Sequence, residues 1–270
     1  MKRIFLFSLV ALSGLLFTLN SCKKEKPDTE TQSSVDNSVC EGEFTRTMNT
    51  INGFGIREQG VKGMQSSCPS ITLSDTVITQ GAWPRTLTID YGTGCYDSID
   101  HKTRKGSITC VFTNYWHLVQ SSIKVNLNNY SVDGISYSAD SIKFTHSAAA
   151  AFTTQVYNGV VTNTSWTMKW SCNRTITQTA GTTTPLDIYD DVYSLTGSAS
   201  GVNRNGLAYS AVISSGIPII KRTSCSWIES GRIDLTPDGY AQRTIDFGNG
   251  ICDNQATLTI NGNTFTFTMN

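Results

Sequence analysis

Apolar and polar residues alternate along most of this chain, and the alternation constrains the fold more than any other feature of the sequence. From Ile71 onward the period is two. Phe265, Phe267 and Met269 share one face of the last segment, and Ser165 to Cys172 alternates in the same way. Such a pattern is typical of β-strands with one buried face.

Five Asn-Gly or Asp-Gly dipeptides interrupt this pattern. Each favours a tight hairpin, because both turn residues need a positive φ. Successive hairpins form an antiparallel meander of about a dozen or more strands. A sheet this wide must fold into a sandwich or a partly closed barrel, so the predicted fold class is all-β. The five dipeptides are Asp133-Gly134, Asn158-Gly159, Asn205-Gly206, Asp238-Gly239 and Asn261-Gly262.

Residues 36–52 show a helical period instead. Cys40, Phe44, Met48 and Ile51 make one apolar stripe, and Asn52-Gly53 is expected to end the helix. We therefore predict one short N-terminal helix that packs on the sheet.

The start of the chain has the pattern of an export signal. Lys2 and Arg3 precede an uncharged apolar run from Ile4 to Phe17, which is shorter than the ~20 residues that span a bilayer. Leu19-Asn20-Ser21-Cys22 resembles the lipobox of bacterial lipoproteins, although Asn20 is larger and more polar than the usual residue. We expect acyl chains on Cys22 and a lipid-anchored location in the cell envelope, in the outer membrane. A plain secretory signal is the alternative.

The sequence thus divides into a signal peptide over 1–21, a disordered polar tether over 22–35 and a single β-rich domain over 36–270. Stretched out, the tether is expected to reach about 40–45 Å. Removing residues 1–21 takes Lys2 and Arg3 from 21 basic residues and none from the 21 acidic ones, which leaves a net charge of −2. The chain has no surplus of basic residues, so we do not expect nucleic acid as a partner.

Two segments, at about 68–114 and 225–270, match each other. Residues 88–97 and 244–253 both read T-I-D, an aromatic residue and G-x-G, with a second aspartate seven positions after the first. In each copy a cysteine near the end has another cysteine the same distance upstream. We predict an internal duplication with one disulfide in each copy, pairing Cys68 with Cys95 and Cys225 with Cys252.

Three cysteines of the mature chain remain after this pairing, and at least one thiol is left over. Cys110 and Cys172 are in step with apolar neighbours, so both are expected to face the core as small hydrophobic residues. The pairing of Cys40, Cys110 and Cys172 stays open.

The repeated aspartates have two interpretations. Asp90 with Asp97, and Asp246 with Asp253, could form a cation loop. The favoured interpretation is a glycine turn whose aspartates accept hydrogen bonds from their own backbone, because a calcium loop usually carries more oxygen ligands. No cofactor is expected, and no catalytic residues stand out. His101, His117 and His146 lack the spacing of metal ligands.

The function classes that stay open are a binding module, a hydrolase and a structural envelope component. A non-catalytic binding or interaction module is favoured, with a glycan, a lipid or an envelope protein as ligand. Tyr115, Trp116 and Trp227 are candidate aromatic platforms for a sugar, although such residues more often fill a core. A polysaccharide-acting hydrolase would have Asp190-Asp191 and the repeated aspartates as its acids.

Several motifs carry a resemblance to a family. They include T-I-D-[YF]-G-x-G-C at 88–95, Gly201-Val202-Asn203-Arg204-Asn205-Gly206, and the segment 246–254. Together they resemble a group of uncharacterised lipoproteins of Bacteroides-like Gram-negative bacteria. The resemblance implies a lipid-anchored, β-rich protein and no particular reaction. Surface display stays open, because Lys23-Lys24-Glu25-Lys26 has one acidic residue where that export signal would have more.

Three short motifs of the form Asp-[Ser/Thr]-apolar resemble the O-glycosylation acceptor of exported proteins in the same bacterial group. They place candidate acceptors at Ser98, Thr76 and Ser141. Ser98 is favoured, because it follows Asp97 in a polar loop where the hydroxyl would reach solvent.

Overall fold

The computed structural model describes residues 28–56, 68–74, 83–97, 101–116, 118–184, 187 and 189–269. One helix and fifteen strands are found in these residues, and the strands join in one antiparallel sheet. The elements are α1 Gln32–Ile56, β1 Ser70–Leu73, β2 Arg85–Asp90, β3 Cys95–Asp97, β4 Lys102–Phe112, β5 Ser122–Val132, β6 Ile135–Ala148, β7 Ala151–Thr162, β8 Thr167–Ala180, β9 Val192–Val202, β10 Ala208–Ile213, β11 Ile219–Arg222, β12 Ser230–Pro237, β13 Arg243–Asn249, β14 Gln255–Ile260 and β15 Asn263–Thr268.

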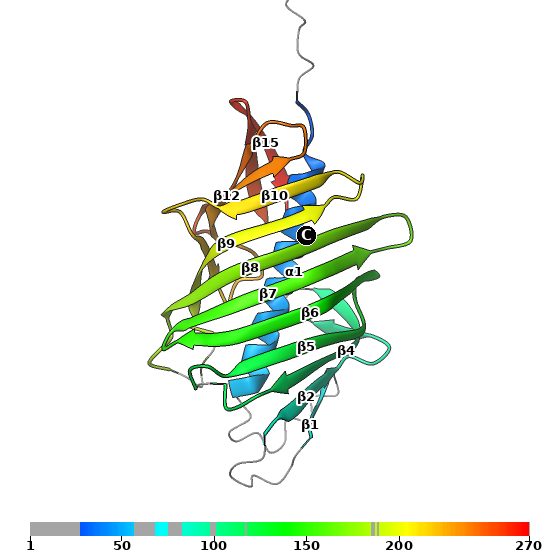
Figure 1. Ribbon diagram of the computed structural model, residues 1–270, viewed down its shortest axis with the longest axis vertical. Coiled ribbons are helices and arrows are strands. Elements are labelled where there is room, and N and C mark those ends of the chain that lie inside the picture. Colours follow the sequence, from blue (N-terminus) through cyan, green and yellow to red (C-terminus); the bar gives the residue numbers. More distant parts are fainter. Residues whose placement is uncertain are drawn as a thin grey trace, which may run out of the picture.

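The strand order follows the sequence order from β1 to β15, apart from two short strands that lie off the main path. β2 and β3 both pair with β4, along different parts of its length. In the same way, β10 and β11 both lie between β9 and β12. This is the antiparallel meander that the alternating pattern predicts. The long middle strands cross one side of α1 and the C-terminal strands curl round behind, so the sheet forms a partial ring about the helix (Figure 1).

Four of the five glycine dipeptides lie at hairpin turns, as predicted. At Asp133-Gly134 and Asn261-Gly262 both residues have a positive φ, which fits the tight turns that join β5 to β6 and β14 to β15. The prediction of a hairpin at Asn158-Gly159 is wrong. Asn158 has a φ of 49° inside β7, where the register with β8 shifts between Val156 and Gly159. The dipeptide therefore forms a β-bulge, which also uses a left-handed residue.

This bulge lets the helix approach the sheet. A Cβ at Gly159 would lie 2.7 Å from the Trp170 carbonyl oxygen and 3.2 Å from the Phe44 ring. Phe44 stacks on Trp170 with ring centroids 5.1 Å apart. A side chain at position 159 would push these two rings apart.

Helix α1 is longer than predicted, beginning four residues before position 36 and ending four residues after position 52. The predicted stripe is confirmed, since Cys40, Phe44, Met48 and Ile51 are all at most 4% exposed. The opposite side is covered as well: from Gln32 to Ile51, every side chain that the structure describes is buried or half-buried. α1 is therefore a central helix rather than a surface helix.

Two buried polar residues of α1 pair with residues of β8. Glu41, 1% exposed, binds Arg174 of β8 through two hydrogen bonds of 3.0 and 2.5 Å. Asn37 accepts a hydrogen bond from the indole nitrogen of Trp170 at 3.1 Å. Buried polar groups are tolerated when they are paired in this way. These pairs account for the weak amphipathic pattern of the helix outside its one apolar stripe.

Ion pairs with Arg243, whose side chain is fully buried, hold the segment before α1 against the body. Arg243 lies 2.9 Å from a carboxylate oxygen of Asp28 and 3.1 Å from one of Glu30. Glu30 also accepts the backbone N–H of Ser33 at 2.8 Å, which caps the first turn of α1. Residues 28–35 of the predicted tether thus belong to the packed body.

The two matching segments have the same local structure. Disulfides join Cys68 to Cys95 and Cys225 to Cys252, each across 27 residues, as the spacing predicted. In one copy β1 pairs with β2, and in the other β12 pairs with β13.

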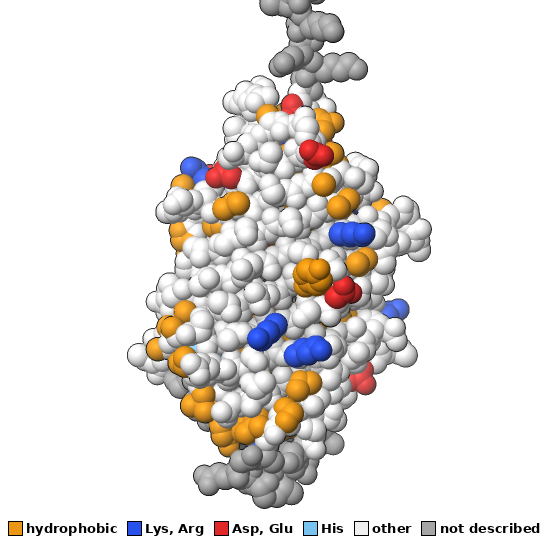
Figure 2. Space-filling model, viewed as in Figure 1, with side chains coloured by type: hydrophobic (Ala, Val, Ile, Leu, Met, Phe, Trp, Pro, Cys, Tyr) orange, Lys and Arg blue, Asp and Glu red, His pale blue; other side chains and the backbone are white. Residues whose placement is uncertain are grey.

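The outer face of the sheet that faces the viewer is mostly uncharged, with lysines, arginines and acidic residues scattered over it (Figure 2).

Candidate binding site

A pocket lies along the side of the sheet where neighbouring antiparallel strands end and begin, so that several turns lie close together. β5, β7 and β9 end there, and β4, β6, β8 and β10 begin there. The β7–β8 and β9–β10 turns are on the right in Figure 1. These turns and one side of α1 enclose a volume of about 280 Å³, which we call the rim pocket. Its lining residues are Val39, Glu43, Lys102, Val132, Asp133, Ile135, Tyr137, Asn163, Trp166 and Arg204.

Arg204 of the β9–β10 turn is held in place by α1 and by Trp166. Its guanidinium lies 2.5 Å from a carboxylate oxygen of Asp36, which is fully buried, and its backbone N–H donates to the other oxygen at 2.8 Å. The guanidinium carbon lies 4.3 Å from the centre of the Trp166 ring, which is a cation–π contact. Arg204 therefore fixes the indole at the wall of the pocket.

The other charged residues of the rim pocket are paired too. Lys102 lies 3.3 Å from a carboxylate oxygen of Asp133, whose second oxygen accepts the Thr103 N–H at 2.8 Å. Glu43 accepts a hydrogen bond from the Tyr130 hydroxyl at 2.8 Å and lies 3.8 Å from Arg104. Each cation and each carboxylate of the pocket thus has a protein partner.

Three uncharged groups of the pocket keep hydrogen-bonding capacity. Asn163 uses its carbonyl oxygen to accept the N–H groups of Ser165 and Trp166, at 2.8 and 3.0 Å. No described residue bonds the Asn163 amide nitrogen, the Trp166 indole nitrogen or the Tyr137 hydroxyl. Burial raises the pKa of Tyr137 far above its ordinary value, so its hydroxyl stays protonated and can both donate and accept.

A small cavity lies between α1 and the sheet. The cavity beside Phe44, Trp170 and Arg174 has a volume of only about 10 Å³, which is about the space of one water. The ligand-sized space described here therefore lies at the rim.

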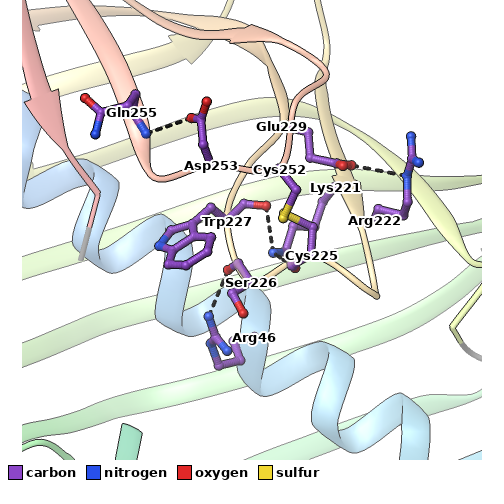
Figure 3. Close-up of a disulfide and its surroundings, with 10 residues drawn as sticks. All are labelled: Arg46, Lys221, Arg222, Cys225, Ser226, Trp227, Glu229, Cys252, Asp253 and Gln255. Atoms are coloured by element: carbon purple, nitrogen blue, oxygen red, sulfur yellow. Dashed lines mark hydrogen bonds and ion pairs between the residues drawn. A yellow bond between two sulfur atoms is a disulfide. The ribbon is translucent and has the colours of Figure 1, made fainter. Parts of the chain in front are cut away.

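The side of α1 away from the long strands is covered by the connection between β11 and β12, which we call the strap (residues 223–229). Arg46 donates to the carbonyl oxygen of Ser226 at 2.8 Å, and the buried Lys221 amine donates to that of Trp227 at 2.9 Å. The Cys225–Cys252 disulfide ties the strap to the segment after β13 (Figure 3). This explains structurally why a cysteine pair is placed here.

The predicted sugar platforms lie elsewhere. Tyr115 meets Trp83 edge-on at 4.9 Å, and Trp116, 6% exposed, stacks on Phe152 at 5.2 Å. Trp227 lies in the strap (Figure 3). None of the three lines the rim pocket.

The repeated aspartates form the same turn in both copies. Asp90 accepts the Gly92 N–H at 2.8 Å, and Asp246 accepts the Gly248 N–H at 2.9 Å. Asp253 accepts the Gln255 N–H at 2.9 Å, whereas the side chain of Asp97 lies outside the described part. These bonds are the ones that the turn interpretation predicts. The described residues contain no group of three His, Cys, Asp or Glu side chains arranged to hold a metal ion.

Asp190 and Asp191 secure the connection between β8 and β9. Asp190 accepts a hydrogen bond from Thr184 at 2.5 Å, and Asp191 accepts bonds from Gln178 and Tyr193 at 2.7 and 2.9 Å. Their carboxylates are occupied by bonds within the protein.

Cys40, Cys110 and Cys172 are buried, so the prediction of core-facing cysteines at 110 and 172 is confirmed. Burial raises the pKa of Cys172 to about 12 and that of Cys40 well above its ordinary value. Both thiols therefore stay protonated and pack as small apolar groups.

The remaining predicted sites are mostly outside the described residues. Cys22, Thr76 and Ser98 fall there. Ser141 lies half-buried within β6, opposite Tyr157 of β7.

The pocket residues Tyr137, Asn163, Trp166 and Arg204 were not expected as site residues. Trp166 has the same parity as the buried Met168 and Trp170, so the alternation predicts a core residue. It precedes β8 and is half-buried against the edge of the core, where it also forms a wall of the pocket.

Comparisons with protein-family models, curated proteins and solved structures find no match for this chain. The described part of the chain has no helix of the length and apolar content needed to cross a membrane.

Proposed function

We propose that this chain is a lipid-anchored cell-envelope protein with a non-catalytic binding function, and that the rim pocket is its ligand site. The pocket itself is the observation that carries the proposal. It combines a fixed indole with uncommitted polar groups, a combination typical of small-molecule sites.

We propose that the lipid anchor is on Cys22. Because Arg243 binds Asp28, only a short segment would connect the anchor to the folded body. Five residues separate Cys22 from Asp28, the first residue that Arg243 binds. Such a stretch of chain spans at most about 20 Å in any conformation. The body would therefore stay close to the surface of the outer membrane, on either of its faces.

Lipid carriage is the less favoured binding function. An acyl chain would need an apolar cavity, and the concave side of the sheet is occupied by α1. The rim pocket is lined by five charged or amide side chains, which do not suit an alkyl chain.

Hydrolysis of a polysaccharide is the alternative in the enzyme class. It would require Glu43 and Asp133 to act as acid and base, because these are the carboxylates that line the pocket. A general acid needs an environment that favours its protonated form. Arg46 and Arg104 lie within 3.9 and 3.8 Å of Glu43, which is the opposite environment.

The test is a ligand screen on the full-length lipoprotein in detergent, with glycans, lipids and envelope proteins as separate arms. Trp166→Ala should abolish the binding that the wild type shows, and no ligand should be cleaved. Binding that is unchanged by Trp166→Ala would refute the rim pocket as the site. Cleavage of a glycan that is lost in Glu43→Gln would favour the hydrolase, and no binding in any arm would favour a structural envelope component.

A further inference from the structure

We propose that the rim pocket holds one uncharged sugar ring of a glycan. This inference rests on the proposed binding function and names the ligand class. Three properties of the pocket support it: its volume, its paired charges and the kind of groups that remain uncommitted.

The volume suits a single ring. About 280 Å³ is far more than the ~10–15 Å³ of such space that one water needs. A hexose has twelve non-hydrogen atoms, so it fits a space of this size, whereas a longer oligosaccharide would have to extend into solvent.

The charges favour a neutral ligand. Arg204 is paired with the buried Asp36, Lys102 with Asp133, and Glu43 with Arg104. A charged ligand would gain little from these groups unless it broke a pair. Breaking the Arg204 pair would leave Asp36, which is 0% exposed, as an uncompensated buried charge.

The uncommitted groups match a ring of hydroxyls. The Asn163 amide and the Trp166 indole nitrogen can donate, and the Tyr137 hydroxyl can donate and accept. Sugar hydroxyls also donate and accept, and their C–H faces pack on aromatic rings. Arg204 holds the indole in place, so a ring that enters the pocket meets a wall that is already oriented.

The experiment uses the full-length lipoprotein in detergent and ligand-detected NMR titration. The neutral probes are methyl glycosides of glucose, galactose and mannose, and N-acetylglucosamine. The charged probes are glucuronate, glucosamine and N-acetylneuraminate, and sorbitol tests an open-chain polyol. The variants are Trp166→Ala, Tyr137→Phe and Asn163→Asp, which keeps the carbonyl oxygen that orders the turn.

Tyr157→Phe is the matched control, because Tyr157 is 63% exposed on β7 and does not line the pocket. A thermal melt of each variant checks that the fold is retained. At least one neutral sugar should bind at least ~10-fold more tightly than every charged probe and sorbitol. Trp166→Ala should weaken that binding at least ~10-fold, and Tyr137→Phe and Asn163→Asp several-fold, because each removes one hydrogen bond.

The other outcomes each overturn the inference. Preference for a charged sugar that depends on Trp166 would refute the uncharged ligand and leave the rim pocket as the binding site. Sugar binding that none of the three variants weakens would refute the site as well. If no sugar binds while a lipid or protein binds in a Trp166-dependent manner, the ligand class is wrong and the proposed function stands.

Discussion

The buried ion pair between Glu41 of α1 and Arg174 of β8 allows a quantitative test of how the helix is held. Both side chains are at most 2% exposed, and the guanidinium grips the carboxylate through two hydrogen bonds. Burial alone would lower the pKa of Arg174, yet the Glu41 carboxylate raises it above its ordinary value. Arg174 thus stays charged, and the Glu41 carboxylate compensates its buried charge.

Removing either partner should leave a buried charge without compensation. We expect Glu41→Leu and Arg174→Met each to lower the free energy of unfolding by about 3–5 kcal/mol. With a urea slope of about 2 kcal/mol per M, the unfolding midpoint would fall by about 1.5–2.5 M.

The double variant Glu41→Leu with Arg174→Met should recover most of this loss. The Nη1 atom of Arg174 has no hydrogen-bond partner among the described residues, so the native pair is itself imperfectly satisfied. Replacing both partners with apolar side chains of similar volume is often neutral or stabilising. Urea unfolding followed by circular dichroism, without reductant, measures all three variants.

The surface pair of Arg232 and Asp246 is the control, with a comparable distance of 2.7 Å but side chains 47% and 31% exposed. Arg232→Met should cost less than about 1 kcal/mol. The reasoning would be refuted if either single variant at the buried pair cost no more than this control. It would also be refuted if the double variant lost the sum of both single costs.

The other predictions concern the anchor, the strap, one carboxyl and one modification. Cys22→Ala should move the protein from the detergent phase to the aqueous phase, and equal partitioning of both proteins would contradict lipidation. Replacing Cys225 and Cys252 with serine should lower the free energy of unfolding by about 2–4 kcal/mol, because the disulfide closes a loop of 27 residues in the unfolded chain; an unchanged midpoint would argue against this. Burial raises the pKa of Asp191, so the folded state holds its proton to higher pH and stability should fall as pH rises above the ordinary aspartate pKa. Asp191→Asn should flatten that fall in a series of urea titrations, and an identical slope would exclude Asp191 as its source. Intact-mass measurement of protein from the native host should show a glycan on Ser98, which Ser98→Ala removes, and a mass of polypeptide plus lipid alone would rule it out.

Much of the architecture follows from local patterns. Alternation predicts which face of a strand is buried, and Asn-Gly or Asp-Gly predicts where positive φ values occur. At Asn158 the positive φ is present but the chain does not reverse, because β7 continues after the bulge and pairs with β8 on both sides of it. The dipeptide predicts a backbone conformation, and pairing with neighbouring strands decides between a turn and a bulge.

The helix shows a similar division. Its apolar stripe is visible as a period, and Cys40 and Phe44 are buried as that period requires. Its polar side gives no such signal, since a charged residue such as Glu41 reads as solvent-exposed until its partner is known. Arg174 lies 133 residues away in the sequence, and only the closure of the sheet brings it to the helix.

The sequence by itself determined the strands, the matching of the two disulfides and the turn chemistry of Asp90 and Asp246, because each depends on neighbours in the chain or on a repeated spacing. Tertiary structure decided that α1 is enclosed, that Arg243 binds Asp28 and Glu30 at the start of the body, and that Trp166, at the edge of the core, also lines a pocket. The physical reason is that alternation along a strand places a side chain on one face of the sheet. Alternation does not predict how closely the helix packs against each position on that face. Trp170 and Trp166 lie on the same face, yet Trp170 is buried beneath Phe44 of α1, whereas Trp166, just before β8, is half-buried and lines the pocket.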